Sequence, residues 1–84
     1  MKSPNISIHV HYFASLREER GTSLELVVTS ASNASELYAE LKQCHGLRVG
    51  QESLRIAIND RFVDWQTELQ DNDKVVFIPP VAGG

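Results

Sequence analysis

Apolar and polar residues alternate from Ile6 to Tyr12, and this period of two is typical of a half-buried β-strand. The side chains expected on its core face are Ile6, Ile8, Val10 and Tyr12. The side chains expected to point outward are Ser7, His9, His11 and then Phe13. Similar apolar runs predict further strands over residues 23–28, 54–58 and 74–78, with a short strand beginning at 62–63.

A single helix is predicted between the second and third strands. Asn33 has the character of an N-cap, with Glu36 at capping-box spacing, and Gly46 suits the helix end. One apolar stripe follows at helical spacing, formed by Ala34, Leu37, Tyr38, Leu41, Cys44 and His45. Residues 15–22 are expected to form only a short polar segment that turns at Gly21. This order of elements predicts an α+β fold with one helix covering one sheet face.

Composition supports one small domain with a real core, because 42% of the 84 residues are hydrophobic. The net charge of −3 argues against nucleic acid as the main partner, since no basic stripe is present to neutralise phosphates. No membrane-spanning run or signal-peptide pattern is evident, so a cytoplasmic location is expected. The lone Cys44 agrees with a reducing compartment, and its place on the helix stripe predicts a buried, inert thiol.

The chain ends in Gly83-Gly84 directly after an apolar strand and Pro79-Pro80. Two terminal glycines contribute no packing and lose much conformational entropy on ordering, so they serve a fold poorly. Their plausible use is to carry a bare backbone and its carboxylate into a narrow cleft. We therefore expect a domain over residues 1–78 and a flexible Gly-Gly tail over 79–84, stiffened at its base by the prolines.

Three motifs of this sequence belong together. The first is Tyr12-Phe13-Ala14 with Arg17-Glu18 and Gly21, and the second is Ala57-Ile58-Asn59 before a turn. The most specific is the ending, D-x-D-x-V-x-F-I-P-P-V-x-G-G from Asp71 to Gly84. With these motifs the chain resembles the family of molybdopterin synthase small subunits, the sulfur carriers within the ubiquitin-like β-grasp superfamily. The resemblance runs from Ile6 to the end, although Ala82 stands where many relatives have a hydroxyl residue.

The resemblance implies a mixed β-grasp sheet with one helix across it, and a carrier whose reactive group is the Gly84 carboxylate. In this family an ATP-dependent activating enzyme adenylates that carboxylate, and a sulfur donor such as a cysteine desulfurase or a rhodanese-like protein supplies the sulfur of a thiocarboxylate. The large synthase subunit then transfers sulfur to a pterin precursor, cyclic pyranopterin monophosphate, to form the molybdopterin dithiolene. The resemblance thus implies a protein co-substrate without a stably bound cofactor, with AMP only transient on Gly84, in a heterotetramer of two small and two large subunits.

Strand alternation also predicts where such partners dock. Val75 and Phe77 share the core face of the last strand, which leaves Lys74, Val76 and Ile78 outward. Phe13, Phe62, Val76 and Ile78 would then form an exposed apolar patch beside the tail, with Arg17 as a further contact. Val81 would add apolar grip within the tail. The alternatives are that Phe62 closes a minor core and that Arg17-Glu18 is only a surface ion pair.

Several other interpretations compete. His9-x-His11 is a possible metal pair, but no third ligand has a fixed spacing, so no metal site is predicted; Trp65 is given no role. One alternative is a sulfur carrier for thiamine thiazole synthesis or tRNA thiolation, although the ending is closest to the molybdopterin branch. Two further alternatives belong to other functional classes. One is a ubiquitin-like modifier that forms isopeptide bonds to lysines, and the other is a binding module whose tail has no function.

Overall fold

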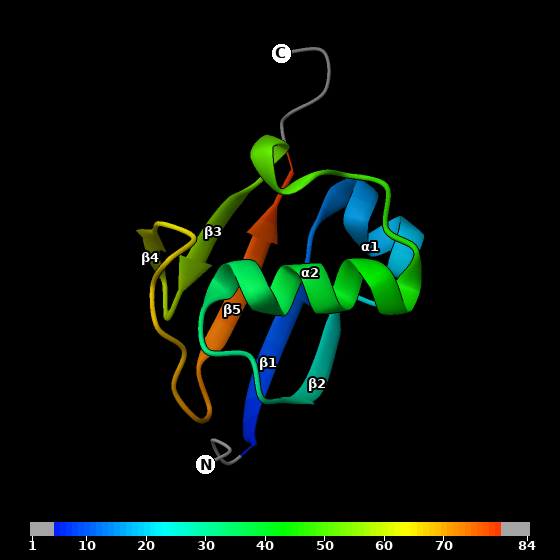
Figure 1. Ribbon diagram of the computed structural model, residues 1–84. Helices are drawn as coiled ribbons and strands as arrows, with labels where there is room; N and C mark the ends of the chain where they lie inside the picture. The colour runs from blue at the N-terminus through cyan, green and yellow to red at the C-terminus, as the bar shows by residue number, and fades with distance from the viewer. Residues whose placement is uncertain (1–4, 80–84) are drawn as a thin grey trace.

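The computed structural model of the chain describes residues 5–79, and its centre is a five-stranded sheet (Figure 1). The strands are β1 (Ile6–Tyr12), β2 (Leu24–Thr29), β3 (Arg55–Ile58), β4 (Arg61–Val63) and β5 (Lys74–Ile78). They lie in the order β2-β1-β5-β3-β4; β1 and β5 run parallel, and every other neighbouring pair is antiparallel. The first and last strands of the chain therefore lie side by side in the middle of the sheet.

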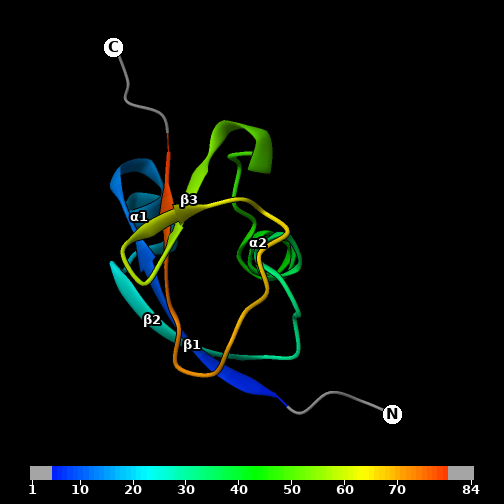
Figure 2. The same cartoon turned by 90° about the vertical axis from the view of Figure 1, so that its left-hand side faces the viewer.

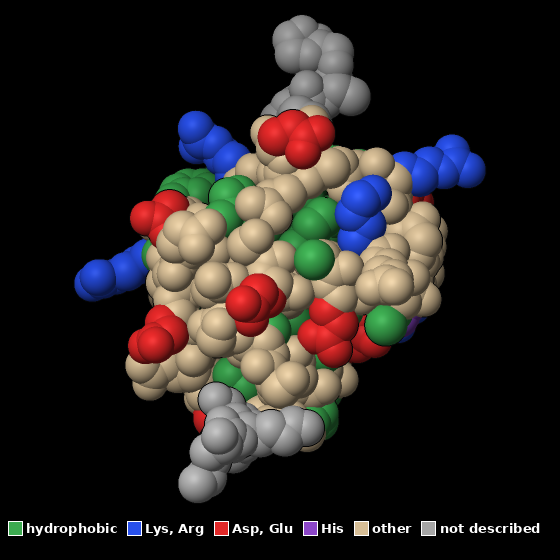
Figure 3. Space-filling view, viewed as in Figure 1, with side chains coloured by type: hydrophobic (Ala, Val, Ile, Leu, Met, Phe, Trp, Pro, Cys, Tyr) green, Lys and Arg blue, Asp and Glu red, His purple; other side chains and the backbone are tan. Residues whose placement is uncertain are grey.

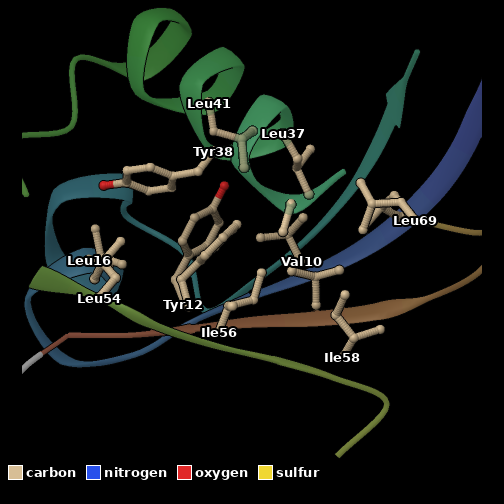
Figure 4. Close-up of a cluster of buried hydrophobic side chains, with 14 of the residues drawn as sticks. Val10, Tyr12, Leu16, Leu37, Tyr38, Leu41, Leu54, Ile56, Ile58 and Leu69 are labelled. Carbon is tan, nitrogen blue, oxygen red and sulfur yellow. The ribbon is translucent and has the colours of Figure 1, made fainter. Parts of the chain in front are cut away.

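Helix α2 (Ala34–His45) crosses one face of this sheet, and Figure 2 shows it end-on at that side. The residues that β1 and β5 send toward it are fully or almost fully buried: Ile8, Val10, Tyr12, Val75 and Phe77. Helix α2 sends back Ala34, Leu37, Tyr38 and Leu41 (Figure 4). Burial of this apolar surface is the main favourable contribution to folding. The mixed sheet and its covering helix confirm the α+β, β-grasp prediction.

Phe77 of β5 packs against two aromatic side chains, Tyr38 of α2 and Trp65 of the loop after β4. Phe77 lies 5.0 Å from Tyr38 and 6.0 Å from Trp65, measured between ring centroids. Trp65, which the sequence analysis left without a role, is partly buried and packs against the main hydrophobic cluster. It therefore fixes the loop after β4 against the core.

The ends of α2 follow the predicted signals. The Asn33 side chain accepts a hydrogen bond from the Glu36 backbone N–H at 2.9 Å, and Gly46 ends the helix with a φ of 65°. The Glu36 carboxylate reaches back to the Ser32 N–H at 2.8 Å, one residue earlier than in a standard capping box. The Ser32 N–H and the Ser32 hydroxyl, which both donate to this carboxylate, hold the pKa of Glu36 below its usual range.

The expectation of an irregular polar segment after β1 was wrong, because residues Ala14–Arg20 form a second helix, α1. Only Leu16 of its seven residues is buried, so the helix has no apolar stripe that a periodicity argument could detect. It ends at Gly21, which has a φ of 78° and donates its N–H to the Arg17 carbonyl at 2.8 Å. Gly21 was correctly identified as a turn residue, but it ends a helix.

The prediction of a buried Cys44 was also wrong, since its side chain is exposed on α2. The buried stripe of the helix ends at Leu41. Beyond Gly46 the chain turns back, and Leu47, only 3% exposed, completes the core at this end of the helix. The core position that the helical spacing assigned to Cys44 is thus filled from the following loop.

The buried carboxylate of Asp73 fixes where β5 begins. It accepts hydrogen bonds from the Asn59 side chain and the Gln70 N–H, both at 2.8 Å. Asn59, at a φ of 52° in the turn between β3 and β4, in turn accepts the Lys74 N–H at 3.0 Å. The Asp73 carbonyl accepts the His9 N–H at 2.9 Å. One residue thereby aligns β5 with both of its neighbours.

A second polar cluster holds α1 against the sheet. Glu25 of β2 points toward the helix side and accepts hydrogen bonds from the Tyr12 hydroxyl at 2.8 Å and from two nitrogens of Arg20 at 3.1 and 2.7 Å. Partial burial disfavours the charged carboxylate, but these donors outweigh it and lower the Glu25 pKa. Burial and the adjacent carboxylate raise the pKa of Tyr12.

This cluster predicts an acid-sensitive contribution to stability. The folded pKa of Glu25 lies below its ordinary value of 4.5, so its stabilising effect is present above that pH and is lost as pH falls through the folded pKa. Urea unfolding from pH 7 to pH 3 should show that Glu25→Gln is less stable at pH 7 and loses less stability on acidification. Glu18→Gln, an exposed change on α1, is the control. Parallel acid profiles for Glu25→Gln and the unmodified chain would contradict this assignment.

Candidate docking face and C-terminal site

The sheet face turned away from α2, here called the outer face, carries one row of side chains from all five strands. Strand pairing places His11 opposite both Leu24 and Val76, and Ala57 opposite both Val76 and Phe62. The row therefore runs Leu24, His11, Val76, Ala57, Phe62 across the sheet. Two residues of the predicted patch, Val76 and Phe62, belong to it.

The other two apolar residues of the predicted patch lie at the end of the sheet from which the tail leaves. Because β1 and β5 are parallel and Tyr12 pairs with Phe77, the following residues Phe13 and Ile78 come at the same end. Phe13 is 51% exposed, Ile78 is partly exposed, and the next residue, Pro79, is buried. The predicted tail residues Pro80, Val81, Ala82, Gly83 and Gly84 lie outside the described residues.

Phe62 is a surface residue, so the alternative that it closes a minor core was wrong. Its side chain is 67% exposed, the highest value among the large hydrophobic residues that the structure leaves open to solvent. The Arg55 guanidinium carbon lies 5.6 Å from the centroid of its ring, within range of a cation–π contact. An open cleft of about 650 Å³ lies beside it, with Arg55, Asp64 and Trp65 in its lining.

Arg17 lies next to Phe13. Both line a smaller hollow of about 380 Å³ together with His11 and Ser23. Arg17 and Glu18 are exposed, and within residues 5–79 they form no ion pair with each other. The structure therefore brings Arg17 to the edge of the predicted patch and does not support the ion-pair alternative.

Strand β2 adds an apolar stripe that the sequence analysis missed. Leu24, Leu26 and Val28 are 52%, 60% and 61% exposed on the outer face, while Glu25 points inward. Hydrophobic residues of a strand usually face the core. In β2 these three face outward instead, because Glu25 lies on the inward side and accepts hydrogen bonds from Tyr12 and Arg20. The sequence does contain a signal for this stripe: Leu24, Leu26 and Val28 alternate along β2, and Glu25, its only charged residue, belongs to the opposite face.

The charges on the outer face are mainly positive. His9 pairs with Lys74 across β1 and β5, Arg55 pairs with Ile78, and Lys74 forms an ion pair with Asp60 at 2.7 Å. Figure 3 shows the opposite, helix-covered side, where acidic and basic side chains are mixed and hydrophobic ones appear only in small separate areas. The outer face thus combines apolar residues with cations, in a chain whose net charge is −3.

Residues 5–79 contain no group of three or more histidine, cysteine or acidic side chains arranged to hold a metal ion. Within the same range, no helix is long and apolar enough to cross a membrane. His9 and His11 share the outer face, flanked by Leu26, Lys74, Leu24 and Val76.

Comparison with known proteins gives the affiliation. A model described as the ThiS family matches residues 10–84, which is most of the chain. This chain belongs to the ThiS family. The molybdopterin synthase sulfur carrier subunit of Mycobacterium tuberculosis is 33% identical over 82 residues, covering 94% of this chain and 99% of that protein. The family resemblance stated from the motifs is therefore confirmed.

Two solved structures extend this result. In the complex of subunits 1 and 2 of the molybdopterin-converting factor from Helicobacter pylori, one chain is 31% identical, with a TM-score of 0.65 over 94% of this ThiS-family chain and 100% of that chain. Small archaeal modifier protein 1 from Methanosarcina acetivorans is 24% identical and has a TM-score of 0.78, covering 98% and 100%. At that identity the second likeness shows a shared fold alone.

The exposures of the phenylalanines predict very different effects on stability. Phe13→Ala and Phe62→Ala remove exposed side chains and should change the free energy of unfolding by less than about 1 kcal/mol. Phe77→Ala empties a fully buried site between Tyr38 and Trp65 and should cost about 3–5 kcal/mol. Denaturant unfolding of the three variants measures this; a loss at Phe13 or Phe62 comparable to that at Phe77 would show that the residue is part of the core.

Proposed function

We propose that this chain is the sulfur carrier of a molybdopterin synthase, and that its Gly84 carboxylate is first adenylated and then converted to a thiocarboxylate. The observation that carries the proposal is the junction of β5 with the tail. The central strand β5 and the buried Pro79 that follows it finish at the same end of the sheet as the exposed Phe13. Membership of the ThiS family and the 33% identical sulfur carrier subunit support it.

The chemistry suits a terminal glycine. A carboxylate is a poor electrophile; attack of its oxygen on the α-phosphorus of ATP, with release of pyrophosphate, makes an acyl-adenylate. The terminal sulfur of a persulfide on the donor then attacks the acyl carbon and expels AMP, which leaves an acyl disulfide. A second thiol attacks the donor sulfur of this disulfide, so that the thiocarboxylate is released as a new disulfide forms. ATP belongs to the activating enzyme in this proposal, and the chain itself carries the acyl group. Glycine has no Cβ to obstruct the backbone in the clefts where these steps occur.

The buried Pro79 gives the tail a fixed origin. Its ring fixes φ and its side chain is buried at the end of β5, so the fold holds the chain as far as this residue. The five residues from Pro80 to Gly84 could span at most about 17 Å when extended. This is enough to bring the sulfur into a neighbouring subunit while the domain stays docked on its surface.

The outer face is the proposed docking surface for the large synthase subunit and for the activating enzyme. Phe13 and Phe62 are its aromatic anchors, with Val76, Ile78 and Arg17 around them. The cations Lys74 and Arg55 favour partner surfaces whose rims are acidic. The Helicobacter pylori complex of subunits 1 and 2 supports a two-subunit assembly of this kind. We extend it to the heterotetramer with two small subunits, working in the cytoplasm.

In this proposal the chain is a co-substrate, and the residues that catalyse sulfur transfer to cyclic pyranopterin monophosphate belong to the large subunit. A protein modifier is the second candidate, favoured by the Gly-Gly ending and by the fold shared with small archaeal modifier protein 1. The two differ in the bond formed. A carrier ends in a thiocarboxylate, whereas a modifier ends in an isopeptide bond to lysine.

Removal of Gly84 should block activation and leave the fold intact. The test uses an N-terminally tagged chain with a free carboxyl end, and mass spectrometry reads the oxygen-to-sulfur change at the terminus after incubation with the activating enzyme, ATP and a sulfur donor. Deletion of Gly84 and Gly84→Ala should abolish the change, while Ala82→Ser, which restores the hydroxyl residue of many relatives, should retain it. An unchanged thiocarboxylate yield in the deletion variant would refute the carrier role; lysine-linked adducts would favour the modifier.

Docking should depend on the exposed aromatics. Phe13→Ala and Phe62→Ala are each expected to weaken binding of the large subunit about fivefold or more, as loss of an interface anchor does. Gln43→Ala, an exposed truncation on α2, is the matched control and should leave affinity unchanged. Calorimetry with the purified subunit measures all three. Equal affinities for the phenylalanine variants and the control would place the interface elsewhere.

A further inference from the structure

Strand β2 forms one outer edge of the sheet, and its unpaired backbone groups can be identified from the register. Tyr12 donates its N–H to the Ser23 carbonyl, so the hydrogen-bonded pairs of β1 and β2 include Val10 with Glu25 and Ile8 with Val27. The alternate residues Leu24, Leu26 and Val28 therefore turn their N–H and C=O groups away from β1. The Thr22 hydroxyl engages both groups of Leu24, at 3.0 and 3.4 Å.

Within residues 5–79, the four backbone groups of Leu26 and Val28 have no hydrogen-bond partner. The side chains of the same two residues are 60% and 61% exposed and apolar. An edge strand usually avoids pairing with other chains through a lysine, a proline or a bulge. Strand β2 has neither lysine nor proline, and it pairs with β1 in continuous register.

The sequence of β2 is complementary to itself in one antiparallel register. With a twofold axis through Val27, Leu26 of one copy lies opposite Val28 of the other, and each such pair exchanges two hydrogen bonds. All four free groups of each copy are then satisfied. A shift of the axis to Leu26 would instead place Val28 opposite Leu24, whose groups already bond to Thr22. The geometry therefore selects the Val27-centred register.

The charges of β2 also match a second copy. Glu25 is its only ionised residue, and it is held toward the helix side by Arg20 and Tyr12. In the Val27-centred register Glu25 lies opposite Thr29 of the other copy, so no like charges meet. On the outer face the cross-strand pairs are Leu26 with Val28, which are apolar contacts of the kind that stabilise sheets. The two edges thus meet without an unpaired charge, although each chain has a net charge of −3.

We propose that two copies of this chain associate through their β2 edges, in antiparallel pairing about Val27, into one continuous sheet. Strand β1 separates β2 from β5, so the pairing leaves the tail-bearing strand and Phe62 uncovered. The association is therefore compatible with docking of a partner on the rest of the outer face. It does not depend on the proposed sulfur chemistry and can be tested with the chain alone.

Sedimentation velocity of the full, untagged chain over a range of concentrations tests the pairing. The apparent mass should approach that of two copies as concentration rises, and Leu26→Lys/Val28→Lys should raise the dissociation constant about tenfold or more. Phe62→Lys is the matched control, since it puts the same charge on the same face at the opposite edge strand; it should associate as the unmodified chain does. Circular dichroism melting verifies that each variant is folded.

Amide hydrogen exchange of the unmodified chain provides a readout that needs no variant. The N–H groups of Leu26 and Val28 should exchange more slowly as concentration rises, whereas those of Glu25 and Val27, already bonded to β1, should not change. A single-copy mass at every concentration would overturn the proposal. Loss of association in Phe62→Lys alone would also overturn it, because that result indicates that the copies stack face to face. Protection of Leu26 and Val28 only after the large subunit is added would overturn it as well, because the β2 edge would then bind that partner.

Discussion

The parallel pairing of β1 with β5 is the constraint on which the rest of this structure depends. These strands come from opposite ends of the chain and occupy the middle of the sheet, so both layers of the core and both neighbouring strands are built around them. Asp73 sets this pairing, because its backbone carbonyl bonds to β1 while its side chain bonds to Asn59 at the end of β3. Asn59 and Asp73 belong to two separate motifs in the sequence, and the fold brings them together for a structural purpose.

Strand β5 has one buried face, which packs in the core, and one partly exposed face, which other proteins can contact. Val75 and Phe77 on one side of β5 are fully buried, and Val76 and Ile78 on the other side remain partly open. The core therefore tolerates no change in the first pair, while the second pair is free to meet other proteins. The buried Pro79 lies at the same end of the sheet as the exposed Phe13. In the proposed carrier, contact with a partner and sulfur transfer would thus be governed by different residues.

Strict alternation and capping signals made most of the fold predictable from the sequence. Ile6–Tyr12 alternates, Lys74 sets the outward side of the last strand, and Asn33 and Gly46 delimit α2, so these elements and their faces followed from local rules. Helix α1 could not be found in this way because it buries only Leu16. The inverted faces of β2 depend on Arg20 and Tyr12, which approach Glu25 only in the folded chain. Cys44 was misplaced because Leu47, beyond the helix end, takes its place in the core.

The central position of β5 also has a consequence for biosynthesis. Strand β5 is translated after the four other strands of the sheet, and its contacts with β1 join residues such as His9 and Lys74 that are far apart in sequence. Loops of this length close slowly, and the central pairing cannot form until the C-terminal strand has left the ribosome. A chain interrupted before β5 therefore lacks the central strand. Because Gly83 and Gly84 follow β5 in the sequence, a chain that contains them also contains every strand of the sheet.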